Sequence, residues 1–186
     1  MDKTLKVAPM LLLCNAVFAT YHIVVGMTAR SWWFLTLGLY YLILSVMRFW
    51  VIKSKRKSAE TFAGHLLMIL SLPLLGITVL SVIGDRGYKL HMIIMIAMAA
   101  YAFGKITVAA VDFVKARKKA AAKIITLRNV SFADAFVSIF ALQRSMLVSF
   151  EGMTASEIQI MNGVLGFAVC VIVFLLGLDL VRGNFK

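Results

Sequence analysis

The sequence predicts an all-α integral membrane protein, a bundle of six transmembrane helices that forms one domain. Hydrophobic residues make up 62% of the 186 positions and the mean hydropathy is +0.93, whereas soluble domains contain about 45–50% apolar residues. The apolar positions gather into six segments, and about 20 residues of helix are enough to cross a hydrocarbon core. The expected spans lie at about residues 8–25, 32–52, 62–83, 90–114, 131–150 and 158–181.

The second, third and fourth spans carry features that are common in membrane helices. Trp32 and Trp33 open the second span, as interface anchors do. Pro73 in the middle of the third span removes a backbone donor, so a kink is expected there. In the fourth span small residues at regular spacing favour close packing against another helix. These residues are Ala97, Ala100 and Gly104.

The connection at residues 115–128 is rich in Ala and Lys, which favour helix. The fourth span is therefore expected to continue out of the bilayer or to turn along its surface. Ser131 and Asp134 follow at a spacing that resembles a capping box, which predicts that the fifth span begins there. A short turn at 151–157 then leads into the sixth span.

Basic residues are distributed unequally between two sets of loops. Fourteen of the 20 Lys and Arg lie in the segments 1–6, 53–58, 115–128 and 182–186, whereas the three intervening turns carry as many acidic as basic residues. Loops rich in Lys and Arg stay on the cytoplasmic side of a membrane. We therefore expect both termini in the cytoplasm and the six spans arranged as three hairpins of one orientation.

A short repeat accompanies the expected hairpins. Phe18-Ala19 precedes Gly-Met-Thr-Ala at 26–29, and Phe140-Ala141 precedes the same tetrapeptide at 152–155. Internal repeats are common in transporter folds, but four residues in a hydrophobic sequence also match by chance. The sequence leaves both interpretations open.

Two stretches of the sequence are distinctive: one runs from Ser31 to Phe49 and includes a Trp-Trp-Phe and a Tyr-Tyr motif, and the other is Ala141–Leu147. They resemble uncharacterised small multi-span membrane proteins of Gram-positive bacteria that have no known activity. The chain departs from that family at Gln143, where the resemblance implies an acidic residue. The resemblance implies a bacterial origin and leaves the mechanism open.

Enzyme and metal-site signatures are missing from the sequence. It has no HExxH, GxSxG, GxGxxG or Walker motif, and His22, His65 and His91 fall at different ends of their spans, too far apart for one metal. The net charge of +12 lies in short loops, which argues against nucleic acid binding. We expect no enzymatic activity, no cofactor, no metal and no nucleic acid partner.

Ionisable and polar residues within the spans fall into two groups by depth. The inner group, expected near the cytoplasmic side, contains Arg48, Lys105, Asp112, Asp134 and Asp179. Charges inside a membrane are costly unless they are paired. This group therefore predicts either a structural layer of ion pairs or a proton or cation relay at the base of a cavity.

The outer group contains His22, Gln143, Arg144 and Asn162. A guanidinium within a span costs about 2.5–3.5 kcal/mol on insertion scales unless it is paired, hydrated or able to snorkel. We expect Arg144 either to snorkel or bind a loop carboxylate, or to line an outward-open pocket that attracts anions. In the second case the other three residues would complete the pocket.

These patterns favour a protein of the bacterial cytoplasmic membrane that binds or transports a small polar or anionic solute through a polar bundle interior. The alternative is a non-transporting partner or regulatory subunit whose basic cytoplasmic face docks a protein or anionic lipid. Both interpretations make the lipid bilayer the main partner, and both are compatible with a homo- or hetero-oligomer.

Overall fold

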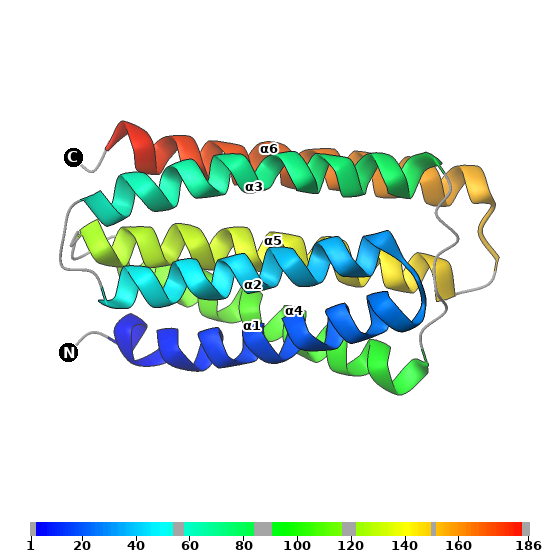
Figure 1. Cartoon of the computed structure of the whole chain (residues 1–186), viewed down its shortest axis with the longest axis horizontal. Coiled ribbons are helices and arrows are strands. Elements are labelled where there is room, and N and C mark those ends of the chain that lie inside the picture. The colour runs from blue at the N-terminus through cyan, green and yellow to red at the C-terminus, as the bar shows by residue number, and fades with distance from the viewer. Residues whose placement is uncertain (1–2, 54–57, 84–90, 117–121, 150–151, 184–186) are drawn as a thin grey trace.

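The computed structural model describes residues 3–53, 58–83, 91–116, 122–149 and 152–183 (Figure 1). These residues form six α-helices, and each contains a segment long and apolar enough to cross a membrane. The predicted all-α class and the expected six helices are therefore confirmed. The helices are α1 (Lys3–Thr28), α2 (Trp32–Lys53), α3 (Ser58–Ile83), α4 (Met92–Ala116), α5 (Ala122–Ser149) and α6 (Ala155–Arg182).

The helices alternate in direction along one long axis, so that the start of α1 and the end of α6 lie at the same end of the bundle (Figure 1). The most extensive contacts join α1 with α2, α3 with α6, and α4 with α5. Within the described parts of the chain, α3 and α4 are not a closely packed pair. The three successive hairpins expected from the sequence are therefore not confirmed, because α3 packs chiefly on α6 rather than on α4.

Two glycines explain why α3 and α6 approach so closely. A Cβ atom added to Gly64 of α3 would lie 2.8 Å from the carbonyl oxygen of Gly177 in α6, and one added to Gly177 would lie 2.8 Å from the carbonyl oxygen of Gly64. Small residues permit this contact between membrane helices, where van der Waals packing drives association.

The small residues of α4 do not have the packing role expected of them. Ala97, Ala100 and Gly104 are exposed, and a Cβ atom at Gly104 would meet nothing within 4 Å. Spacing alone does not reveal which face of a helix turns toward the bundle.

Helix α5 begins at Ala122, well before the expected start at residue 131. Its early residues Ile124, Ile125 and Leu127 are buried, so packing continues the helix through this stretch. Ser131 and Asp134 consequently lie inside α5, and the capping box expected there is wrong.

A capping box is present at the start of α6 instead. The backbone N–H of Thr154 donates to Glu157 Oε2 at 2.8 Å, and Thr154 Oγ1 accepts from the backbone N–H of Glu157 at 3.4 Å. This reciprocal pair satisfies backbone donors that the first turn of a helix leaves without partners.

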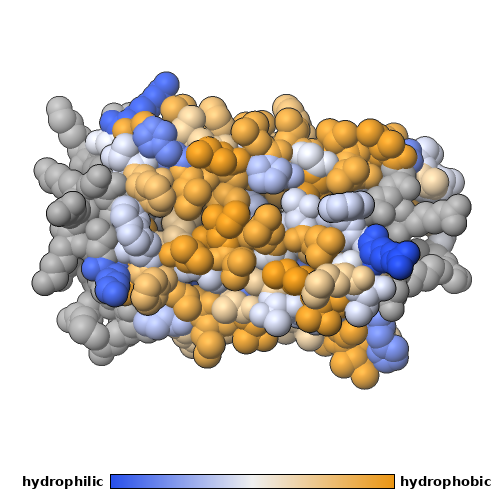
Figure 2. All heavy atoms as spheres, viewed as in Figure 1, coloured by the Kyte–Doolittle hydropathy of each residue, from blue (hydrophilic) through white to orange (hydrophobic). Residues whose placement is uncertain are grey.

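The outer surface matches an environment of lipid. On the face seen in Figure 2, apolar residues dominate the middle of the bundle and the most hydrophilic residues lie toward its two ends. Large side chains such as Leu72 and Val164 are about two-thirds exposed. Such a broad apolar surface is typical of a protein that crosses a membrane.

Candidate functional site

Asp134 of α5 lies at the centre of the polar interior and is 1% exposed. Its Oδ1 atom is 2.5 Å from Nζ of Lys105 in α4. Its Oδ2 atom accepts a hydrogen bond from Asn15 Nδ2 of α1 at 2.7 Å and lies 3.4 Å from Arg48 Nη2 of α2. One carboxylate thus joins three neighbouring helices to α5.

Hydroxyl groups complete the surroundings of this carboxylate. Ser138 Oγ, one turn along α5, donates to the backbone oxygen of Asp134 at 2.7 Å. Because it has only one hydrogen to donate, Ser138 accepts from Lys105 Nζ and Tyr41 Oη, both at 3.0 Å. Tyr101 Oη donates to Asn15 Oδ1 at 2.5 Å.

We call this set the Asp134 cluster. It consists of Asn15, Tyr41, Arg48, Tyr101, Lys105, Ser131, Asp134 and Ser138, where Ser131 Oγ accepts from Arg48 Nη2 at 3.3 Å. In α5 the serines lie three residues before and four after the carboxylate, so all three side chains share one helix face.

Aromatic rings enclose the ammonium group of the cluster. Lys105 Nζ lies 4.4 Å from the ring centre of Tyr41 and 4.0 Å from that of Tyr101. Phe18 stacks on Tyr101 with ring centres 3.6 Å apart. A cation over an aromatic face is attracted by the ring quadrupole, and more strongly when water is excluded.

The cluster lies near the middle of the bundle rather than near the end at which the sequence analysis expected the inner group. Asp134 is 12 positions from Ala122 and 15 from Ser149, or about 18 Å from the start of α5 at 1.5 Å per residue. Lys105 is similarly central in α4. Arg48 lies five positions before the end of α2, and its side chain extends to this level.

The inner group expected from the sequence is only partly assembled. Arg48, Lys105 and Asp134 are in contact. Asp179 lies elsewhere, where its Oδ2 atom accepts from Asn129 Nδ2 at 3.2 Å. The side chain of Asp112 is outside the described part of the structure.

The outer group does not assemble around Arg144. The Arg144 side chain is buried, and its guanidinium carbon lies 4.5 Å from the ring centre of Trp33 in α2. Gln143 Nε2 instead donates to the backbone oxygen of Met161 in α6 at 3.3 Å. Asn162, the next residue, is 1% exposed, and its Oδ1 atom has no hydrogen-bond partner among the described residues.

His22, the fourth member of that group, belongs to an aromatic layer above the Asp134 cluster. Its Nδ1 atom lies 2.8 Å from the backbone oxygen of Phe18, and its ring centre is 5.5 Å from that of Tyr41. The buried Nε2 atom has no hydrogen-bond partner within the described structure. Tyr41, a member of the Asp134 cluster, therefore also contacts His22 and places it next to the cluster.

Three pockets among the described residues lie on the outer surface of the bundle. They occur between α1 and α4, between α2 and α3, and between α5 and α6, and none of them is lined by Lys105, Asp134 or Arg144. Over the described ranges, no group of three or more His, Cys, Asp or Glu side chains is placed to hold a metal ion.

Comparison with protein-family models, curated proteins and solved structures gives no match. The three charged side chains of the Asp134 cluster have formal charges that sum to +1, because two cations contact a single carboxylate. Such an arrangement suits a carboxylate or phosphate, which guanidinium and ammonium groups bind through charge-assisted hydrogen bonds.

Proposed function

We propose that this protein binds a small anionic solute in the middle of the membrane and transports it, with the Asp134 cluster as the solute site. The observation that supports this proposal is the convergence of Lys105 and Arg48 on Asp134 within the apolar interior. Charged residues at such a depth are expensive and are a mark of solute, ion or proton pathways. The proposal assigns no catalytic residue.

In this mechanism Asp134 acts as the internal counter-ion of an empty site. A solute carboxylate or phosphate takes its place beside Lys105 and Arg48, and the planar guanidinium of Arg48 supplies paired donors that match such an oxyanion. The released Asp134 keeps the hydrogen bond from Asn15, which is 2.7 Å long in the present arrangement. Exchange between these two pairings would couple solute binding to movement of α4 relative to α5.

The test uses the purified protein in liposomes made of one lipid mixture. Uptake of inorganic phosphate, acetate, lactate and glutamate would be followed by radiolabel. We expect at least one of these anions to enter faster than into empty liposomes, and we expect Lys105→Met and Arg48→Met to abolish the difference. Arg182→Gln, which changes an exposed residue in the last turn of α6, is the matched control.

Two results would contradict the proposal. One is uptake by Lys105→Met at the wild-type rate, which would remove the cluster from the pathway. The other is uptake of none of the four anions by a wild-type protein that is folded and monodisperse in the liposomes.

A non-transporting partner or regulatory subunit is the second candidate function. It is favoured by the tight closure of the cluster, since Lys105 is 4% and Asp134 1% exposed. In a transporter, a cysteine at position 105 should react with a small water-soluble thiol reagent from one side of the membrane. In a permanently closed subunit the same cysteine should stay unreactive from both sides.

The proposal also includes a location and an orientation. It places the protein in the bacterial cytoplasmic membrane with both termini in the cytoplasm, because the loops rich in Lys and Arg share one side. Lys53 and Ser156 are exposed at opposite ends of the bundle and provide the two test positions.

For this prediction, single cysteines are introduced into a background in which Cys14 and Cys170 are Ser. Cysteine at Ser156 should react with a membrane-impermeant maleimide added to whole cells, and cysteine at Lys53 should react only after the membrane is opened. The opposite pattern would reverse the orientation.

A further inference from the structure

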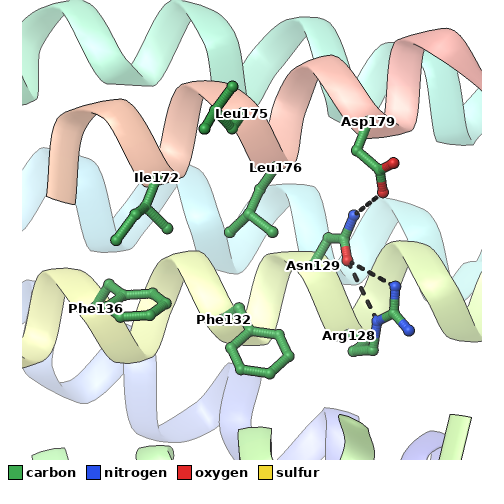
Figure 3. Close-up of a pocket in the computed structure, with 8 residues that line it drawn as sticks. All are labelled: Arg128, Asn129, Phe132, Phe136, Ile172, Leu175, Leu176 and Asp179. Carbon is green, nitrogen blue, oxygen red and sulfur yellow. Dashed lines mark hydrogen bonds between the residues drawn. The ribbon is translucent and has the colours of Figure 1, made fainter. Parts of the chain in front are cut away.

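A groove between α5 and α6 combines a charged end with an apolar floor (Figure 3). Its volume is about 340 Å³, within the range of ligand sites in proteins. The residues that line it are Arg128, Asn129, Phe132, Phe136, Ile172, Leu175, Leu176 and Asp179.

The charged end holds one cation and one anion, joined by an amide. Asn129 Oδ1 accepts from Nε and Nη2 of Arg128, each at 3.4 Å, and Asn129 Nδ2 donates to Asp179 Oδ2 at 3.2 Å. Figure 3 shows these contacts as a chain from the guanidinium to the carboxylate. A ligand that covers this end therefore meets a positive and a negative group side by side.

The rest of the groove is apolar and faces the lipid. In Figure 3 Ile172 and Leu176 extend from α6 toward α5, where Phe132 and Phe136 lie. Leu175 at the rim is 54% exposed, so the groove is open to the outer surface of the bundle.

The groove also has the depth and direction of one acyl chain. Asp179 lies three positions before the end of α6, which puts the charged end close to the membrane surface. From Arg128 to Phe136 helix α5 rises by about 12 Å, compared with about 15 Å for half of a hydrocarbon core about 30 Å thick. A lipid aligned with the bilayer would place its headgroup at the charged end of the groove and one acyl chain along the apolar part.

We propose that this groove binds a zwitterionic phospholipid with a primary ammonium, of the phosphatidylethanolamine type. The phosphate contacts Arg128, the ammonium contacts Asp179, and one acyl chain lies against Phe132, Phe136 and Leu176. A headgroup with negative charge alone would meet the Asp179 carboxylate. A choline headgroup carries positive charge but has no N–H to donate to that carboxylate.

The site differs from the docking of anionic lipid on basic loops that the sequence suggests, and it does not depend on the proposed transport of a solute. Its charges are balanced, and it lies between α5 and α6, where Arg128 is the one lining residue that belongs to the segments rich in Lys and Arg. Binding here would tie α5, which carries Asp134, to α6.

The experiment is native mass spectrometry of the purified full chain after exchange into equal amounts of dioleoyl phosphatidylethanolamine, phosphatidylcholine and phosphatidylglycerol. We expect phosphatidylethanolamine to be the most abundant retained lipid. Arg128→Gln should lower its retention about five-fold, as the loss of one exposed charge pair does. Asp179→Asn should abolish the preference for phosphatidylethanolamine over phosphatidylcholine.

Two further variants separate this site from general lipid adhesion. Leu176→Trp fills the groove without changing a charge and should reduce retention of phosphatidylethanolamine. Arg182→Gln removes an exposed basic residue near the same end of α6 and should leave retention unchanged. Each variant is compared at matched thermal stability and size-exclusion profile, so that unfolding is not mistaken for loss of lipid.

Retention of phosphatidylglycerol at or above the level of phosphatidylethanolamine would overturn the proposal, because it would mean that positive charge alone selects the lipid. Equal losses in Arg182→Gln and Arg128→Gln would also overturn it. So would an unchanged lipid profile in Leu176→Trp.

Discussion

Asp134→Asn is expected to lower the free energy of unfolding by about 3–5 kcal/mol, the usual cost of breaking a buried ion pair by removing one partner. The reason is that a single carboxylate contacts both Lys105 and Arg48 in the bundle interior. An amide of the same shape keeps the hydrogen bonding of Asn15 but removes the negative charge. Unfolding in detergent, followed by circular dichroism against added dodecyl sulfate, measures the difference.

The double variant Asp134→Asn with Lys105→Met should be more stable than Asp134→Asn alone, because it no longer buries the ammonium beside an uncharged amide. Asp179→Asn is the matched control, since Asp179 is only partly buried and accepts a hydrogen bond from Asn129. We expect its effect to be below about 1 kcal/mol, as for exposed charges. A double variant no more stable than Asp134→Asn would show that the contact with Lys105 does not stabilise the fold.

The number of helices could be predicted because it depends on a local property, the length of each apolar segment. Most boundaries followed from the same property, and α2 ends at Lys53, one residue beyond its expected limit. The start of α5 could not be found in this way. The sequence indicates helix at residues 115–128 but assigns it to a continuation of the fourth span, whereas the buried residues Ile124, Ile125 and Leu127 belong to α5.

The partners of each helix could not be predicted from local patterns. Gly64 and Gly177 lie more than 100 residues apart, and nothing near either residue indicates that their backbones meet. The spacing of Ala97, Ala100 and Gly104 suggested a packing face, and that face is exposed. The rotation of a helix about its axis depends on the whole bundle, which a pattern within one segment does not determine.

The candidate site could be predicted in part. A Lys in the middle of a span needs a counter-ion, but the sequence offered Asp112, Asp134 and Asp179 with no means to choose between them. The periodicity of α5 could have singled out Asp134. Ser131, Asp134 and Ser138 lie on one face and form a polar stripe on a helix of the core. Asn15, near the middle of α1, gave a second signal that only the structure connected to Asp134.

Arg144 illustrates a different limit. The sequence suggests a carboxylate, water or a bound anion as the partner of Arg144, whereas the described contact is with the face of Trp33. The sequence places Trp33 among the interface anchors, and in the structure it is 2% exposed and packs inside the bundle. An aromatic face also attracts a guanidinium, so a buried Arg in a span does not by itself indicate an anion pocket.

Gly177→Ala is expected to destabilise the protein by about 1–3 kcal/mol, the usual cost of overpacking a close contact. The added methyl group would lie 2.8 Å from the carbonyl oxygen of Gly64 and 2.9 Å from the backbone nitrogen of Met68. Backbone atoms cannot rotate away as a side chain can, so α3 and α6 must move apart. Gly177→Leu should destabilise the protein more than Gly177→Ala does. Both variants are measured by the same dodecyl sulfate unfolding.

Gly76→Ala in α3 is the control, and it is expected to raise the free energy of unfolding rather than lower it. A Cβ atom there meets nothing within 4 Å, and replacing Gly by Ala inside a helix stabilises it by about 0.5–1 kcal/mol. The two substitutions are chemically identical, and they differ in what the methyl group meets. If Gly177→Ala proved as stable as Gly76→Ala, the contact between the glycine backbones would not hold α3 against α6, and another contact would have to explain why α3 packs on α6 rather than on α4.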